Sequence, residues 1–303
     1  MAFFAGTVVA VQSRINGALG SALGDGVQAA AISFGIGLLV LVVVVGVRSP
    51  ARAAFAGLRD QVRSRRLPWW TLLGGLAGAT YVSAQSVTVA ALGVALFTVS
   101  TVAGQTGMSL AVDRTGIGPG GVVHVTAIRV VAAVLTTVAV AVAAGSRGWS
   151  GDFSWGYVGL ALVAGAAVAF QAAFNGRVSM VTGRPTVAAL VNFIVGFTGL
   201  VVVMVALLTA GGRQWGSLPS VSSHGWLYLG GPLGVVFVVS AAWSVRALGV
   251  LLFSLVVIAG QLSGALLLDV LAPTPGSEIS AGLIAGVALT ATAVGLAALP
   301  RRL

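Results

Sequence analysis

The sequence predicts an all-α membrane protein built from ten transmembrane helices in two inverted-topology five-helix repeats. Of its 303 residues, 58% are hydrophobic and only 7% are charged, whereas soluble domains carry about 25% charged residues. Apolar runs long enough to cross about 30 Å of hydrocarbon, at about 20 residues each, recur from end to end. The third observation is an internal sequence repeat of about half the chain.

The apolar runs between Gly, Pro and Arg residues define the expected spans. Backbone in hydrocarbon must satisfy its own hydrogen bonds, and the runs show no alternating barrel pattern, so each span is expected to be a helix. The ten spans lie near residues 2–20, 28–47, 69–90, 93–112, 121–144, 155–175, 187–210, 225–245, 249–269 and 279–299.

Two blocks of sequence recur in the same order. GTVVAVQSRING (6–17) matches GAAVAFQAAFNG (165–176) at six of twelve positions, and residues 91–113 match residues 247–269 at 11 of 23. The offsets of 159 and 156 are nearly equal, which membrane composition alone does not explain. Because each half holds an odd number of spans, the second half must enter the membrane upside down. We therefore expect repeats over 1–148 and 149–303.

The arginines indicate the orientation. The chain has no lysine, and with the N-terminus inside, twelve arginines fall in inner loops while only Arg147 and Arg213 fall outside. Basic loops stay cytoplasmic, so we expect a cell-membrane protein with both termini in the cytoplasm. The net charge of +10 thus reports topology and not nucleic-acid binding. The longest loop is expected to form an amphipathic helix resting Phe55, Leu58 and Val62 on lipid headgroups.

Several kinds of chemistry are excluded by composition. The chain has no cysteine, and His124 and His224 lie far apart, so disulfides, thiolate chemistry and the common zinc motifs are absent. No acid pair, metal cluster or nucleophile with a base is visible. We expect no cofactor, no metal and no enzymatic activity.

The motif pattern resembles a known family. It comprises G-x-x-x-A-x-Q-x-x-x-N-G in the first span, then W-x-x-x-G-G, then L-G-x-x-x-F with a trailing G-Q and L-x-x-D. This pattern resembles a small five-helix family of the drug/metabolite transporter superfamily, and this chain is similar to two such proteins fused. The resemblance implies that the first four helices of each half surround a solute path while the fifth and tenth are peripheral. One departure is Ala241, which stands where the first half has Gln85.

Amide side chains within the spans are the main candidates for lining a solute path. Polar side chains at membrane depth face either protein or water, so they either bond between helices or line a path. Spacing of four puts two such residues on one helix face, and both halves contain this arrangement. The candidates are Gln12, Asn16, Gln105, Gln171, Asn175 and Gln261, together with the aromatic residues Tyr81 and Trp243, for which packing is the alternative role.

Three charged residues have two alternative roles each. Arg14 lies within the first span, where it either binds an anionic solute or extends toward the outer headgroups. Asp113 and Asp269 lie at span ends, where each either caps a helix or closes a gate. No acid lies in the middle of a span, so the sequence does not demonstrate proton coupling.

These features predict a secondary transporter that moves a small polar metabolite or drug-like solute by alternating access. Inverted repeats around a site near the membrane midplane are a familiar plan of such transporters. The alternative is a membrane scaffold or sensor that retains the fold without transport. The expected partners are the solute and the lipid bilayer, and the protein is either a monomer or a homodimer. The small-residue face of Gly282 and Gly286 serves either dimerisation or packing within one chain.

Overall fold

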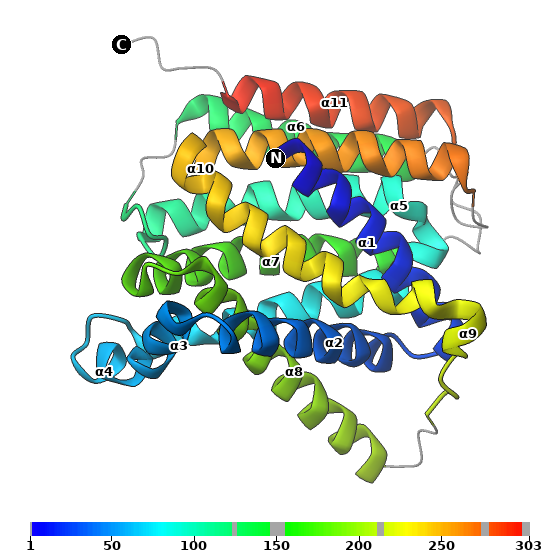
Figure 1. The fold of residues 1–303 in the computed structure, drawn as a ribbon. Helices are drawn as coiled ribbons and strands as arrows, with labels where there is room; N and C mark the ends of the chain where they lie inside the picture. Colours follow the sequence, from blue (N-terminus) through cyan, green and yellow to red (C-terminus); the bar gives the residue numbers. More distant parts are fainter. Residues whose placement is uncertain (1, 123–125, 146–154, 211–214, 274–278, 299–303) are drawn as a thin grey trace.

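The computed structural model describes residues 2–122, 126–145, 155–210, 215–273 and 279–298, and at 129, 241–255 and 297–298 it describes the backbone alone. Every regular element in these ranges is a helix (Figure 1), so the predicted all-α class is confirmed. The elements are α1 (Ala2–Leu23), α2 (Gly26–Gly46), α3 (Ser49–Ala56), α4 (Leu58–Arg63), η1 (Trp69–Leu73), α5 (Gly74–Thr115), α6 (Ala127–Gly145), α7 (Trp155–Thr182), α8 (Pro185–Thr209), α9 (Val221–His224), η2 (Gly225–Leu229), α10 (Gly230–Leu271) and α11 (Ala281–Ala298).

Local sequence explains where the first helices of each repeat end. Gly24 and Gly183 follow α1 and α7 with φ angles of 64° and 66°, a left-handed conformation that glycine adopts without strain at helix C-termini. The Asp25 carboxylate then accepts hydrogen bonds from the first backbone N–H groups of α2, whereas α8 begins with Pro185 in its first turn. The two glycines lie 159 residues apart, at the offset of the sequence repeat.

Four described helical segments are long and apolar enough to cross a membrane: α2, α7, α8 and the continuous segment Trp69–Thr115. Shorter apolar helices span Val130–Gly145, Val256–Leu271 and Ala281–Leu296. The expected spans 69–90 and 93–112 both lie within Trp69–Thr115, which breaks at Gly93 (φ 73°, ψ 165°). The count of exactly ten spans therefore stays a prediction.

The long helices α5 and α10 each consist of two arms. In Figure 1 the arms of α5 meet toward the right of the bundle, and the arms of α10, in yellow and orange, meet at the left. Each repeat's first helix packs along the other repeat's long helix, α1 on α10 and α7 on α5. Both contacts depend on glycine. A Cβ on Gly165 of α7 would lie 1.9 Å from the Thr101 carbonyl oxygen, and a Cβ on Gly6 of α1 would lie 2.0 Å from that of Val257.

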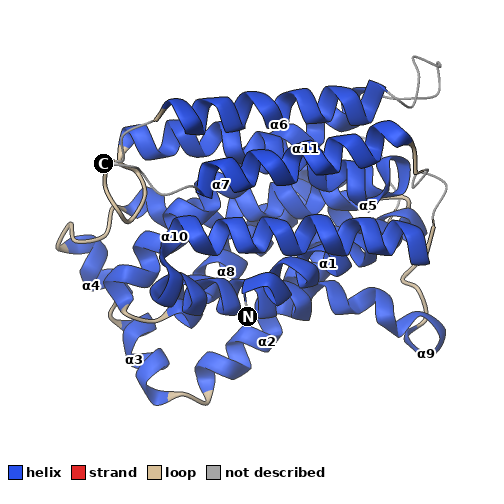
Figure 2. Cartoon of the chain, turned by 90° about the horizontal axis from the view of Figure 1, so that it is seen from above, coloured by secondary structure: helices blue, strands red, loops and turns tan. Residues whose placement is uncertain are grey.

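Helices α6 and α11 run side by side along one side of the bundle (Figures 1 and 2). A Cβ on Gly286 of α11 would lie 2.7 Å from both the Ala139 carbonyl oxygen and the Ala143 Cβ of α6. Gly286 therefore packs within one chain, and of the two roles expected for this face the structure shows packing at that residue.

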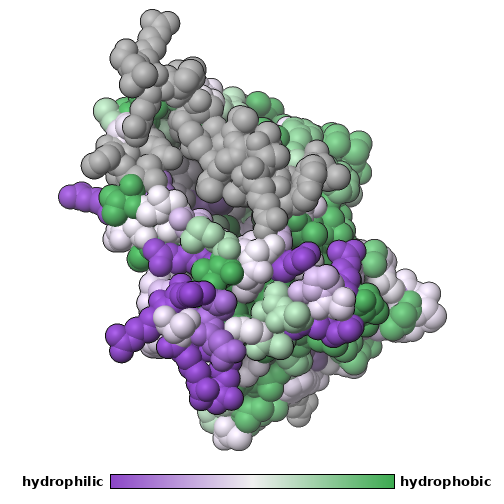
Figure 3. Space-filling model, turned by 60° about the vertical axis from the view of Figure 1, so that its left-hand side comes forward, coloured by the Kyte–Doolittle hydropathy of each residue, from purple (hydrophilic) through white to green (hydrophobic). Residues whose placement is uncertain are grey.

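The longest loop packs partly against the bundle, where the sequence predicts one amphipathic helix on the headgroups. It forms two short helices, α3 and α4, and Leu58 and Val62 pack on a buried cluster of Leu67, Val178 and Ala188. Two of the three apolar residues of the expected lipid face therefore pack within the protein, whereas Phe55 on α3 is exposed. The exposed arginines of this loop form the hydrophilic patch in the lower part of Figure 3; they are Arg48, Arg52, Arg59, Arg63, Arg65 and Arg66.

Candidate functional site

A cavity lies at the centre of the bundle, between α1, α2, α5, α7, α8 and α10. The space in which the centre of a water molecule fits is about 60 Å³, which holds a few waters. The described residues that line it are Val9, Gln12, Ser33, Phe34, Gly78, Tyr81, Val82, Thr101, Gln105, Val168, Gln171, Asn192, Phe193, Gly234, Phe237, Val238 and Gln261.

The lining follows the sequence repeat. All but Thr101 fall into eight pairs whose members are separated by 159 residues on the first two helices of each repeat, or by 156 on the long helices. The pairs are Val9 with Val168, Gln12 with Gln171, Ser33 with Asn192, Phe34 with Phe193, Gly78 with Gly234, Tyr81 with Phe237, Val82 with Val238, and Gln105 with Gln261. The two repeats therefore contribute matching walls to one cavity.

Gln12 and Asn16 share one face of α1 but make different contacts. Gln12 lines the cavity, and its Nε2 donates to the Gly230 carbonyl oxygen at 3.1 Å. Asn16 is fully buried behind it, where its Nδ2 donates to Gln85 Oε1 at 2.9 Å and Gln85 Nε2 donates to Ser13 Oγ at 2.7 Å. The Asn16 Oδ1 atom has no hydrogen-bond partner in the part of the chain that the structure describes. Asn16 thus belongs to a buried polar network and supports the cavity wall.

The equivalent amides on α7 use a different partner. Gln171 Nε2 and Asn175 Nδ2 both donate to Asn192 Oδ1 of α8, each at 3.0 Å. Gln171 and Asn192 line the cavity and Asn175 does not. Asn192 stands where the first repeat has Ser33, and Ala241 stands where it has Gln85. The two halves therefore hold equivalent amides by unequal networks.

Small residues make room for these amides. A Cβ on Gly78 would lie 2.3 Å from Gln171 Nε2, and a Cβ on Gly234 would lie 2.7 Å from Gln12 Nε2. Any larger residue at either position would push the amide out of its place, so the long helices need glycine here for the first helices to present their amides.

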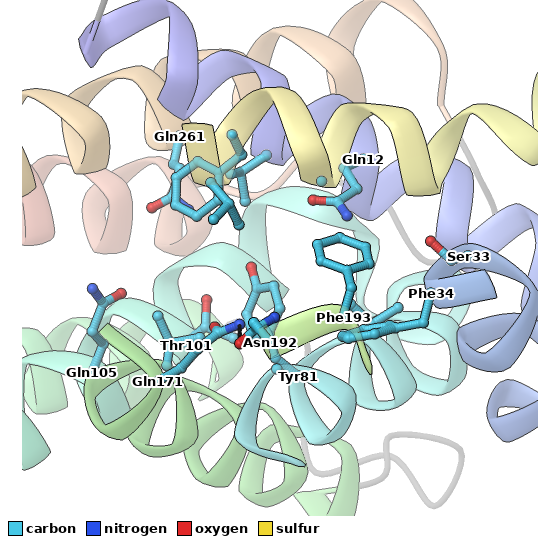
Figure 4. Close-up of a pocket in the computed structure, with 17 residues that line it drawn as sticks. Gln12, Ser33, Phe34, Tyr81, Thr101, Gln105, Gln171, Asn192, Phe193 and Gln261 are labelled. Atoms are coloured by element: carbon cyan, nitrogen blue, oxygen red, sulfur yellow. Dashed lines mark hydrogen bonds between the residues drawn. The ribbon is translucent and has the colours of Figure 1, made fainter. Parts of the chain in front are cut away.

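Gln105 and Gln261 lie on the long helices and complete the polar lining. Figure 4 shows Gln12 and Gln261 on one side of the cavity and Gln105 and Gln171 on the other. Tyr81 also lines the cavity, with its ring 5.8 Å from that of Phe97. Five of the eight candidate lining residues therefore meet here. The side chain of Trp243 lies outside the described residues.

Sequence reasoning missed the lining residues on the second helix of each repeat. There are two in each: Ser33 and Phe34 on α2, and Asn192 and Phe193 on α8. The Phe34 and Phe193 rings lie 4.9 Å apart, so this pair lines the cavity where α2 meets α8. The signal was the common offset of 159, which extends past the matched block 6–17 to these positions.

Asp269 caps a helix of the other repeat. Its buried carboxylate accepts hydrogen bonds from the backbone N–H groups of Val94 at 3.1 Å and Ala95 at 2.7 Å. These are the first N–H groups after the break at Gly93, where a new helical arm begins with unpaired donors. Asp113, its counterpart in the sequence, lies in the last turn of α5.

Arg14 is absent from the cavity lining and is half-buried at the far end of α10. Its guanidinium donates to the carbonyl oxygen of Ala272, the C-cap residue that directly follows α10. A cation at this position stabilises the negative end of the helix dipole. The structure thus gives Arg14 a helix-end contact. Among the residues described, no group of three or more His, Asp or Glu side chains is placed to hold a metal ion.

Comparisons with known proteins agree with this architecture. The family model described as "Putative inner membrane exporter, YdcZ", of the drug/metabolite transporter type, matches residues 1–142 and again residues 156–296. A solved structure described only as "Crystal structure of protein" is similar over 98% of this chain and 93% of its own, with 20% identity and a TM-score of 0.55. That likeness shows the fold alone. The comparison with curated proteins finds no match.

Proposed function

The chain belongs to the YdcZ family of inner membrane exporters, and from this premise we propose that it moves a small polar solute across the cell membrane by alternating access. The predicted resemblance to a tandem form of the drug/metabolite transporter type is thereby confirmed, as is the multi-pass membrane class. The family is one of transporters rather than enzymes. The solute class and the mechanism are our proposals.

The observation that carries the proposal is the paired lining of the cavity. A site shared by two repeats can open in two related ways. The elements separate either at one end of the bundle or at the other. Transporters with inverted repeats bind their solute at such an interface, and one repeat moves against the other around it. The amides of Gln12, Gln105, Gln171 and Gln261 supply polar contacts for a solute in that place.

An inverted relation between 1–148 and 149–303 is also part of the proposal. It is supported by the opposite ends at which the arms of α5 and α10 meet in Figure 1. The cytoplasmic placement of both termini is supported by the arginine patch (Figure 3) around α3 and α4, which lie at the left-hand end of the bundle in Figure 1, because basic loops stay on the cytoplasmic side.

Cysteine accessibility tests the proposal directly, since the chain has no native cysteine. Gln12→Cys and Gln171→Cys proteins would be treated with a charged, membrane-impermeant thiol reagent in right-side-out and in inverted vesicles. Alternating access predicts that each position reacts from both sides. Leu19→Cys on α1 and Ala161→Cys on α7 are the matched controls, because both residues are fully buried away from the cavity and should not react.

The other results have definite meanings. Reaction from one side only would contradict alternating access. Complete protection of both cavity positions from both sides would contradict transport and favour the scaffold or sensor alternative, in which the amides serve helix contacts alone.

A further inference from the structure

The cavity contains hydrogen-bonding groups that the protein itself does not use. Within the described part of the chain, the side chains of Gln105 and Gln261 have no hydrogen-bond partner, although both line the cavity and are half-buried. Gln12 and Gln171 each use their Nε2 on the protein, and neither Oε1 has a hydrogen-bond partner among the described residues. Buried amide groups are normally paired. The unused groups are therefore available to a solute.

These groups suit a ligand that both donates and accepts. Each carboxamide offers an N–H donor beside a carbonyl acceptor, in one plane. A solute edge that also carries one donor beside one acceptor pairs with it through two hydrogen bonds, because each donor then faces the acceptor of the other edge. The two complete amides, on α5 and α10, are equivalent positions in the repeat, and in Figure 4 they lie on opposite walls.

Aromatic side chains from both repeats also line the cavity, next to valine, glycine and three further polar residues. Tyr81 and Phe237 are equivalent residues on the long helices, and Phe34 and Phe193 line the cavity on the side of α2 and α8. Aromatic rings pack best against flat groups, either stacked or edge to face. This part of the cavity favours a planar solute over a globular one of equal volume.

Formal charge is absent from the described lining residues. A charged solute would lose its hydration here and find only amide and hydroxyl dipoles in return, which is costly in a low-dielectric site. Resting on the proposed transport function, we propose that this cavity binds an uncharged, planar solute bearing an amide-like edge, such as an aromatic carboxamide or a ring lactam.

Three probes of nearly equal shape test the proposal. Benzamide, benzoate and benzamidine share one ring and at neutral pH are neutral, anionic and cationic. Their dissociation constants would be measured on the purified full-length protein by the concentration dependence of its thermal stability, because a ligand of the folded state raises apparent stability. We expect benzamide to bind at least about ten-fold more tightly than either ion. Benzoate has no donor and benzamidinium has no acceptor, so each ion loses one of the two hydrogen bonds to the carboxamide.

Charge substitutions in the cavity provide a second measurement. Gln105→Glu and Gln261→Glu should weaken benzamide binding by about ten-fold and reverse the preference toward benzamidine, because a carboxylate lacks the donor and pairs with a cation. Gln61→Glu on α4 is the matched control, since Gln61 lies outside the cavity, and it should leave the three affinities unchanged. If a variant fails to fold, Gln105→Leu or Gln261→Leu tests the loss of benzamide binding alone.

Two results would overturn the inference. One is tighter binding of benzoate or benzamidine than of benzamide by the unmodified protein, and the other is no binding of benzamide at all. Neither result touches the proposed function, which is judged by the reaction of cysteines at positions 12 and 171. A cavity that opens to both sides yet prefers an ion would leave alternating access standing and reject the neutral solute.

Discussion

Two charged side chains in the bundle serve backbone groups at helix ends of the other repeat. Asp269 of the second repeat accepts from Val94 and Ala95 in the first, and Arg14 of the first repeat donates to Ala272 in the second. Negative groups stabilise helix N-termini and positive groups stabilise C-termini. Since each contact joins the two repeats, each contributes to holding the halves together.

Removing the Asp269 carboxylate should therefore destabilise the protein. In Asp269→Ala two buried N–H donors lose their acceptor, which costs about 2 kcal/mol or more of unfolding free energy. Asp269→Asn keeps one acceptor oxygen and should lose less. Thermal unfolding in detergent measures both, with Asp60→Ala on exposed α4 as the control. Equal stability of Asp269→Ala and the unmodified protein would refute the capping role.

At the scale of elements, the contact between α7 and α5 depends on the absence of a side chain. The Gly165 Cα faces the Thr101 carbonyl oxygen so closely that an added Cβ would lie 1.9 Å from it, and Gly104 meets the Leu162 carbonyl in the same way. The α1–α10 contact repeats both features at Gly6 and Gly260. Close packing of this kind is a main source of helix association in membranes, because lipid tails are as apolar as the helices and the hydrophobic effect does not drive the helices together.

A methyl group at this contact should push the two helices apart. We expect Gly165→Ala to lose about 1–3 kcal/mol of stability, the usual cost of overpacking, and to weaken ligand binding because Gln105 and Gln171 lie on the same pair of helices. Gly159→Ala on α7 has open space around its Cβ and is the matched control. Stability in detergent and ligand binding would be measured for both. Equal behaviour of the two variants would show that the contact tolerates separation.

At the scale of the whole molecule, the two ends of the bundle differ in charge. The exposed arginines of α3 and α4 gather at one end, whereas α9 lies at the other (Figure 1). This asymmetry favours an inner and an outer end, with the cavity between them enclosed by both repeats.

Labelling of intact cells tests that orientation. Ser64→Cys at the end of α4 and Ser222→Cys on α9 are both exposed, conservative substitutions in a chain without cysteine. A membrane-impermeant thiol reagent should label position 222 in intact cells and position 64 only after permeabilisation. The reverse pattern would place the arginine patch outside and reject cytoplasmic termini.

Much of the fold and part of the site could be predicted from local sequence. The all-α class followed from apolar length, because a membrane leaves the backbone no other hydrogen-bond partner. The repeat identified Gln12, Gln171, Gln105 and Gln261, since equivalent positions in two related halves meet at their shared interface. Ala241, which stands at the position equivalent to Gln85, also indicated that the two halves differ.

Other features depend on contacts between residues far apart in the chain. Sequence pattern placed Asp269 at a span end and left its role between a cap and a gate; only the packing of α10 on α5 decided which N–H groups it meets. Sequence pattern offers Arg14 either an anionic solute or the headgroups, whereas in the structure it donates to a carbonyl 258 residues away. Asn16 and Asn175 were grouped with the lining, yet helix rotation turns them toward neighbouring helices. Sequence thus determined which residues are polar and repeated, whereas the tertiary structure decided which of them face the cavity, because that choice depends on how each helix is rotated and on what packs against it.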